Sequence, residues 1–191
     1  EVASTLTLED AWTPTSILQK IAKATNPPFH CLIDTGALVT GLSNAQVARY
    51  LLEQGLAGID GVVFLDQHDR KMVMLRDGLR VVSLPQCGLS RARRFVFYDQ
   101  VHTTGTDIDL VLNAVGAITL SKDMTFRDYA QGAFRMRLVG KGQRLCVVST
   151  PEVDTSMSHL STFLSERGCG VAPSVSSSRR RLVEISQWLL L

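Results

Sequence analysis

Five short and almost purely apolar runs recur between residues 30 and 149, and they constrain the fold more than any other feature of the chain. They lie at 30–34, 61–66, 94–99, 116–120 and 143–149. Strands with apolar side chains on both faces are typical of a parallel sheet that helices cover on both sides. We therefore predict an α/β fold with a mainly parallel sheet flanked by helices.

Amphipathic patterns separate several of these runs, and they predict helices at 8–24, 43–55 and 123–136. The middle helix has the clearest ends, because Ser43 and Asn44 can cap its start and Gly55 can end it. Residues 71–75 follow the run at 61–66 after a short polar turn, which predicts a hairpin.

The pattern divides the chain into three parts. We expect a helical lead-in at 1–28 and an α/β lobe at 29–153. Residues 154–191 are expected to form a weakly structured extension, with a Ser-, Gly- and Arg-rich linker and a terminal helix. Both ends look cut from a longer protein.

Composition excludes several classes of protein. Of the 191 residues, 45% are hydrophobic and 20% are charged, which is ordinary for a globular domain. The net charge of +2 does not support nucleic acid as a partner, although a local basic patch is compatible with it. The four cysteines form no C-x-x-C pair, so we expect no metal site. Free thiols, the lack of a signal peptide and the lack of a long apolar run predict an intracellular, cytoplasmic location and no membrane contact.

The polar loop at 99–107 is the best candidate for a functional site. Ligands of open α/β sheets bind at the carboxyl ends of the strands, and Asp99 comes at such an end. In the same loop, Gly105 lets backbone approach a ligand, while the hydroxyl of Thr104 and the carboxylate of Asp107 can bind it. A tight turn whose side chains only satisfy the backbone is the simpler interpretation.

Two segments in this region resemble motifs of superfamily-two helicases. Residues 104–108 (Thr-Gly-Thr-Asp-Ile) are similar to their fifth motif, and residues 129–135 (Tyr-Ala-Gln-Gly-Ala-Phe-Arg) to their sixth. The resemblance implies a second RecA-like lobe in which Gln131 and Arg135 face a nucleotide. Arg137 stands one residue short of the place of the second arginine. The alternative is that these arginines lie on a solvated helix face or form salt bridges to Asp99, Asp107 or Asp109.

The phosphate-binding loop G-x-x-x-x-G-K-[ST] is absent from the chain. We therefore predict a RecA-like lobe without this loop and no cofactor in this chain alone. ATP and Mg²⁺ would bind only together with another lobe of the same larger protein. Residues 99–102 (Asp-Gln-Val-His) also resemble a degenerate second motif of the first helicase lobe, in which Asp99 would hold Mg²⁺ and Gln100 replaces the glutamate that activates water.

Four segments also resemble the C-terminal region of very large, uncharacterised eukaryotic proteins that are catalogued as ubiquitin thioesterases. They lie at 33–38, 63–66, 102–107 and 135–143. The resemblance implies a cysteine-type ubiquitinyl hydrolase with ubiquitin as a partner. Such an enzyme needs a thiol with a histidine in reach, and Cys31 with His102 is the best pair, with His68 as a second candidate. A structural Cys31 in the core is the alternative.

The leading hypothesis is a helicase-lobe-like module that completes a nucleotide- or partner-binding cleft and is not catalytic alone. Its site residues would be Asp99, Thr104, Gly105, Asp107, Gln131 and Arg135. Part of a deubiquitinase is the second hypothesis, with Cys31 and His102 as catalytic residues.

Overall fold

The computed structural model describes residues 2–167 and 177–190, and they form an α/β fold around one eight-stranded sheet. The strand order is β1-β8-β7-β2-β6-β3-β4-β5. The first six strands in this order, β1 through β3, pair with their neighbours in parallel, whereas the β3–β4 and β4–β5 pairs are antiparallel. The strands are β1 (Val2–Thr7), β2 (Cys31–Ile33), β3 (Gly61–Leu65), β4 (Lys71–Leu75), β5 (Val81–Ser83), β6 (Arg94–Tyr98), β7 (Val115–Leu120) and β8 (Arg144–Ser149). The predicted mainly parallel sheet and the hairpin at 61–75 are confirmed.

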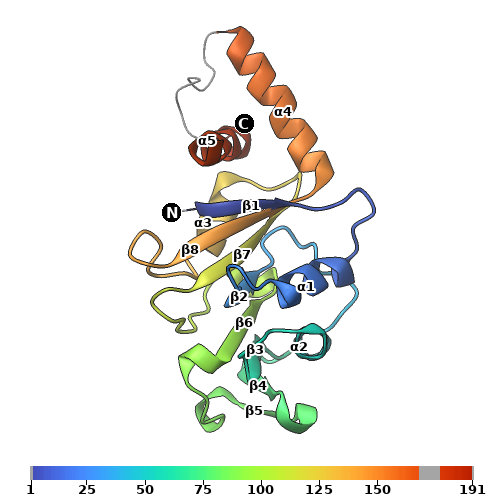
Figure 1. The fold of residues 1–191 in the computed structure, drawn as a ribbon, viewed down its shortest axis with the longest axis vertical. Coiled ribbons are helices and arrows are strands. Elements are labelled where there is room, and N and C mark those ends of the chain that lie inside the picture. Colours follow the sequence, from blue (N-terminus) through green and yellow to red (C-terminus); the bar gives the residue numbers. More distant parts are fainter. Residues whose placement is uncertain (1, 168–176, 191) are drawn as a thin grey trace.

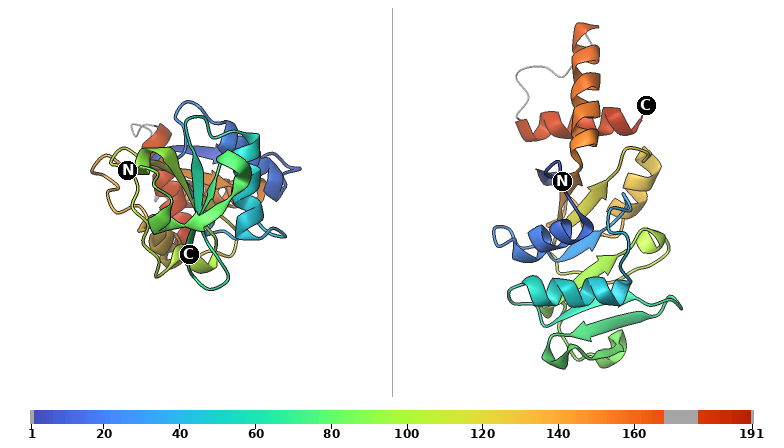
Figure 2. Two further views of the ribbon diagram at one scale, coloured as in Figure 1. Left: turned by 90° about the horizontal axis from the view of Figure 1, so that it is seen from below. Right: turned by 90° about the vertical axis from the view of Figure 1, so that its right-hand side faces the viewer.

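Helices cover both faces of this sheet, as Figures 1 and 2 show. On one face, α1 (Pro14–Lys23) and α2 (Asn44–Gln54) pack on the side chains of Leu32, Phe95 and Phe97. On the opposite face lies α3 (Phe126–Ala133), whereas α4 (Pro151–Glu166) and α5 (Ser177–Leu189) lie past the β1 edge and add Val153, Met157, Ile185 and Leu189 to the core of that face. The alternation along β6 explains the two layers, because its successive side chains point to opposite faces. Both cores are apolar, which is why the sequence shows nearly continuous apolar runs.

The N-terminal segment differs from the predicted helical lead-in. Residues Val2–Thr7 form β1, an edge strand parallel to β8, so the sheet begins well before residue 29. Helix α1 is shorter than the predicted 8–24 and begins after Thr13, whose side chain accepts from the N–H of Ser16. Strand β1 was missed because its Ser and Thr residues dilute the apolar pattern, and only pairing with β8 makes it a strand.

The C-terminal extension is more ordered than predicted. Helix α4 spans Pro151–Glu166, and its hydroxyl side chains bond back to carbonyls one turn earlier; for example, Thr155 donates to Pro151 (2.9 Å) and Thr162 to Ser158 (3.0 Å). This back-bonding satisfies polar side chains that make the sequence look like a loop. The predicted terminal helix is α5, which packs on α4 and β1 and buries Ile185. Residues 168–176 of the predicted linker lie outside the described residues.

A single carboxylate joins these C-terminal helices to the sheet. Asp154 of α4 accepts from Ser149 at the end of β8 (2.6 Å), from Thr7 at the end of β1, and from Arg181 of α5. Four elements therefore meet at one charged group that is largely shielded from water. Hydrogen bonds to ionised groups are stronger than neutral ones, so this joint holds the helices in a defined position.

The end of α2 is held by an arginine from the strand region of the hairpin. Arg76 donates to four carbonyls, those of Leu52 (2.7 Å), Gly55 (2.7 Å), Leu56 (3.0 Å) and Ile59 (2.8 Å). The last carbonyls of a helix have no partner inside it, and a cation at this end also offsets the helix dipole.

We expect Arg76→Met to lower the free energy of unfolding by about 2 kcal/mol, because several charge-assisted hydrogen bonds are lost at once. Urea unfolding would measure the change. Arg80→Met is the matched control, since Arg80 is 68% exposed and pairs only with the exposed Asp77; it should cost less than about 0.5 kcal/mol. Equal losses for the two variants would contradict this role of Arg76.

Candidate site at the carboxyl edge of the sheet

The buried carboxylate of Asp34 organises the carboxyl edge of the central strands. Asp34 follows β2 directly and accepts from the N–H groups of Leu38 and Val39 (both 2.9 Å) and from the hydroxyl of Thr119 (2.8 Å). Thr119 in turn accepts from the N–H of Gly36 (2.9 Å). Burial raises the pKa of Asp34, and these hydrogen bonds partly offset that shift. Asp34 therefore fixes the turn after β2 against β7.

This edge is also where the chain changes direction between the two faces. After β2 the chain passes to α2 on one face, and after the neighbouring β7 it passes to α3 on the other. Ligands of open α/β sheets collect at such switch points, because the two loops diverge and leave a crevice.

A pocket of about 680 Å³ lies there, and we call it the edge pocket. Four segments line it: the turn after β2, the loop after β6, the loop after β7 and one side of α3. Its polar lining residues include Thr35, Gln100, Thr103, Thr104, Ser121, Lys122, Asp123, Asp128 and Gln131. The predicted residues Thr104 and Gln131, which are far apart in the sequence, therefore line one pocket.

Arg135 contacts the loop at 99–107 on its buried side. This arginine is only 8% exposed, and its guanidinium donates to the carbonyl of Thr106. It lies beyond α3, which ends at Ala133 with Phe134 as its cap, so the helix is three residues shorter at each end than the predicted 123–136. The structure places Arg135 under the loop and not on an exposed helix face.

Asp107 and Gly105 form the outer part of the same loop. Asp107 pairs with the half-exposed Arg137 (3.3 Å), as the ion-pair alternative predicted for this arginine, and its carbonyl accepts from Lys71 of β4 (2.5 Å). Gly105 has a φ of +72°, a conformation that suits glycine. The loop is thereby tied to both the hairpin and the segment after α3.

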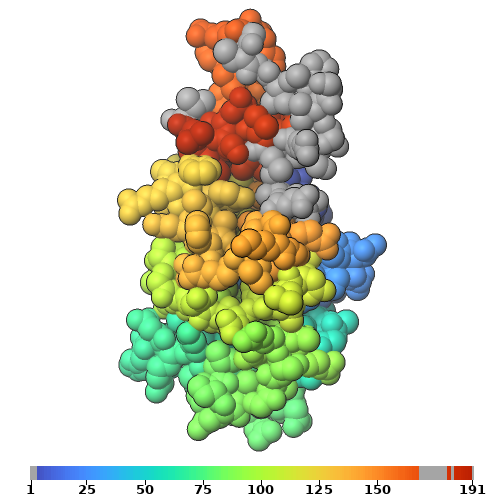
Figure 3. Space-filling view, turned by 90° about the vertical axis from the view of Figure 1, so that its left-hand side faces the viewer, coloured from blue at the N-terminus to red at the C-terminus, as the bar shows by residue number. Residues whose placement is uncertain are grey.

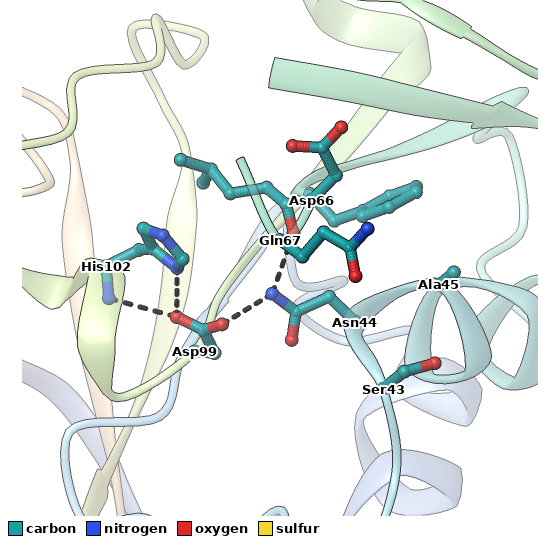
Figure 4. A pocket seen from close by; sticks show the side chains of 9 residues that line it. Ser43, Asn44, Ala45, Asp66, Gln67, Asp99 and His102 are labelled. Atoms are coloured by element: carbon teal, nitrogen blue, oxygen red, sulfur yellow. Dashed lines mark hydrogen bonds and ion pairs between the residues drawn. The ribbon is translucent and has the colours of Figure 1, made fainter. Parts of the chain in front are cut away.

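Asp99 lies in a second, neighbouring pocket of about 400 Å³ (Figure 4). Its carboxylate accepts from the side-chain amide of Asn44 at the start of α2 and from the N–H of His102 (2.9 Å). Asn44 also donates to the carbonyl of Leu65, so one amide links α2, β3 and the loop. Asp66 and Gln67 form the opposite side of this pocket.

His102 bridges two carboxylates. Its Nδ1 lies 2.5 Å from Asp99 and its Nε2 lies 2.9 Å from Asp69, which is in the turn of the β3–β4 hairpin. Partial burial lowers the pKa of His102, but its hydrogen bonds to the carboxylates of Asp69 and Asp99, together with their charges, outweigh it, so the net pKa is above the ordinary value. The imidazole therefore links the loop to the hairpin, and we call this contact the clamp.

Among the described residues, no hydrogen bond joins Cys31 to His102, whose ring nitrogens contact Asp99 and Asp69. Cys31 is fully buried at the first position of β2, and its sulfur lies beside Gly116 and Met136 in the core. Burial raises the pKa of this thiol to about 12, so it is a thiol and not a thiolate at neutral pH. Cys31 thus has the properties of the core residue that was the alternative. His68 is exposed, with Gln67 as its side-chain neighbour.

Several residues of this edge were not selected from the sequence. Asn44 was assigned only to the cap of α2, and Thr35, Lys122 and Asp69 were not considered. A signal for them exists, because loops that follow neighbouring parallel strands meet at one edge. Using this signal requires the strand order of the sheet, and no local sequence motif indicates that order.

Comparison of the chain with models of protein families, with curated proteins and with solved structures finds no match. Within the described residues, no helix combines the length and the apolar character that crossing a bilayer requires. The same residues contain no group of three or more His, Cys, Asp or Glu side chains placed to hold a metal ion.

The contact between Thr35 and α3 generates a stability prediction. The hydroxyl of Thr35 is buried without a hydrogen-bond partner among the described residues. A Cβ added to Gly132 would lie only 2.5 Å from this hydroxyl oxygen. We expect Gly132→Ala to lower the free energy of unfolding by about 1–3 kcal/mol through overpacking, although alanine favours helices. Thr35→Ala should restore stability in the double variant, as measured by thermal unfolding. A Gly132→Ala protein as stable as the parent would refute this contact.

The clamp at His102 predicts a dependence of stability on pH. Because its pKa is raised in the folded state, the charged imidazole stabilises fully below its ordinary pKa of about 6.5. That contribution is lost as the pH rises through the folded pKa. The unfolding free energies of the parent and of His102→Gln, measured in urea, should therefore differ most below about pH 6.5 and converge as the pH rises above it. His159→Gln, on the exposed side of α4, is the control; a constant difference for His102→Gln would argue against the clamp.

Proposed function

We propose that this chain is one lobe of a two-lobed nucleotide-binding cleft in a longer protein, with a layout similar to the second RecA-like lobe of helicases. The observation that carries the proposal is that Thr104 and Gln131, from the two helicase-like motifs, line one polar pocket at the switch point of a parallel sheet. Two motifs that resemble a family separately acquire weight when they share a site.

The chemistry of the edge pocket fits part of a nucleotide. Its hydroxyl and amide groups suit the donors and acceptors of a ribose and a base. Its lining includes one cation, Lys122, against the carboxylates of Asp123 and Asp128, a balance that does not suit a triphosphate. The chain also lacks a phosphate-binding loop. In this proposal the second lobe supplies the phosphate donors, so that ATP and Mg²⁺ bind only between the lobes.

Support of the loop matters for such a half-site. Arg135 holds the loop from its buried side through the carbonyl of Thr106. Arg137 lies half-exposed beside Asp107, where its side chain can turn towards a nucleotide phosphate that the second lobe binds. A preorganised wall loses less entropy when the cleft closes. Arg137 replaces Arg135 here as the arginine that would approach a phosphate, because Arg135 is already committed to Thr106.

The thiol-protease alternative draws little support from this geometry. A cysteine nucleophile must be accessible and must have a base in reach. Cys31 meets neither condition, since it is fully buried in the core and its thiol pKa is about 12.

Titration with a fluorescent ATP analogue tests the half-site. The isolated chain should bind with a Kd on the order of 1 mM or weaker and release no phosphate, whereas a longer protein that includes the second lobe should bind at least about tenfold tighter. In the longer protein, Gln131→Ala and Thr104→Val should weaken binding by about tenfold, because each removes a polar contact.

Thr162→Val is the matched control, because this threonine is exposed on α4 and bonds only to its own helix. Micromolar binding by the isolated chain would show a complete site and overturn the proposal. So would a longer protein whose affinity is unaffected by both pocket variants.

A further inference from the structure

A groove of about 500 Å³ runs beside α3, away from the polar lining of the edge pocket, and we call it the α3 groove. Apolar side chains dominate its lining, which includes Phe126, Tyr129, Ala133, Phe134, Val139 and Leu145. In Figure 3, the yellow segment of α3 and the amber turn that leads into β8 lie on the face turned to the viewer. The groove is thus bounded by one helix on one side and by a turn on the other.

The apolar surface of this groove is unusually open to water. Phe134 is 65% exposed and Phe126 is 43% exposed. Leu112, which is 72% exposed, lies next to the same turn, since its carbonyl oxygen would be 2.7 Å from a Cβ on Gly142. Exposed aromatic side chains around a hollow mark an interaction surface more often than isolated exposed residues do.

Residues 126–144, which supply most of the groove's lining, are rich in cations, although the chain as a whole has a net charge of only +2. Arg137 lines the groove itself and pairs with Asp107. Between residues 126 and 144 the single acidic residue is Asp128, which caps α3 through Thr125. The basic residues in the same segment are Arg127, Arg135, Arg137, Lys141 and Arg144. All of them except the buried Arg135 are exposed.

We propose that the α3 groove docks an acidic amphipathic helix of a partner protein. A helix can place apolar side chains at i, i+3, i+4 and i+7 into a groove while its carboxylates meet the cations at the rim. A second copy of this chain does not fit the surface, because two such faces would bring like charges together. The α3 groove and the edge pocket share no lining residue, so the docking proposal does not rest on nucleotide binding, although Arg137 has a part in both proposals.

The test uses the whole chain and synthetic peptides of about 18 residues, or five helical turns. The acidic peptide carries Leu along one face and Glu elsewhere, and one control peptide replaces every Glu by Lys. A second control keeps the composition but scatters the Leu residues around the helix. Fluorescence anisotropy should show binding of the acidic peptide alone, at least about tenfold tighter than either control and weaker at high salt.

Phe134→Ser should weaken binding of the acidic peptide by about tenfold, and so should Arg137→Gln with Lys141→Gln. Phe163→Ser is the matched control, as another exposed phenylalanine that lies on α4. Circular dichroism would show that the variants remain folded. Equal binding of the acidic and basic peptides, or no effect of Phe134→Ser, would overturn the proposal. Tighter binding of a thymidine oligonucleotide that is lost in Phe134→Ser would overturn it in favour of nucleic acid.

Discussion

The burial of one carboxylate, that of Asp34, is the constraint on which the carboxyl edge depends. An ionised group in the interior costs several kcal/mol unless donors surround it. Two N–H groups of the following turn and the hydroxyl of Thr119 supply those donors. The turn after β2 therefore has one favourable arrangement, and that arrangement sets the floor of the edge pocket.

The other loops at the carboxyl edge also depend on polar contacts between segments that are distant in the sequence. Asn44 links the start of α2 to Asp99, His102 connects the loop to Asp69 of the hairpin, and Arg135 holds the loop at Thr106. Each contact joins segments that are separated by an intervening element of the fold. Such links order polar loops without apolar burial, because charge-assisted hydrogen bonds are stronger than neutral ones. A polar site can then remain open to a ligand while its loops keep one conformation.

The segment after β7 serves two surfaces at once. One side of α3 carries Gln131 into the edge pocket, and its other side carries Tyr129 and Phe126 to the α3 groove. Arg135 and Met136, just beyond the helix, are both buried, so the segment between the two surfaces is firmly packed. In the proposed functions, a helix partner in the groove and a nucleotide at the edge would contact opposite sides of one short helix.

The sequence by itself determined the fold class and most elements, because apolar runs, caps and turn residues act locally. Ser43 and Gly55 mark both ends of α2, as the sequence predicts, and Thr125 caps α3 by the same local rule. Strand β1 and the length of α4 were missed, since the first depends on pairing with β8 and the second on hydroxyls that bond to their own helix. Thr104 and Gln131, which the sequence singled out, line one pocket at the carboxyl edge. Only the tertiary structure decided that Cys31 lies in the core, that Arg135 supports the loop, and that Asn44, Asp69 and Thr35 join the site. Strand order and burial set those outcomes, and both arise from contacts between residues distant in the chain.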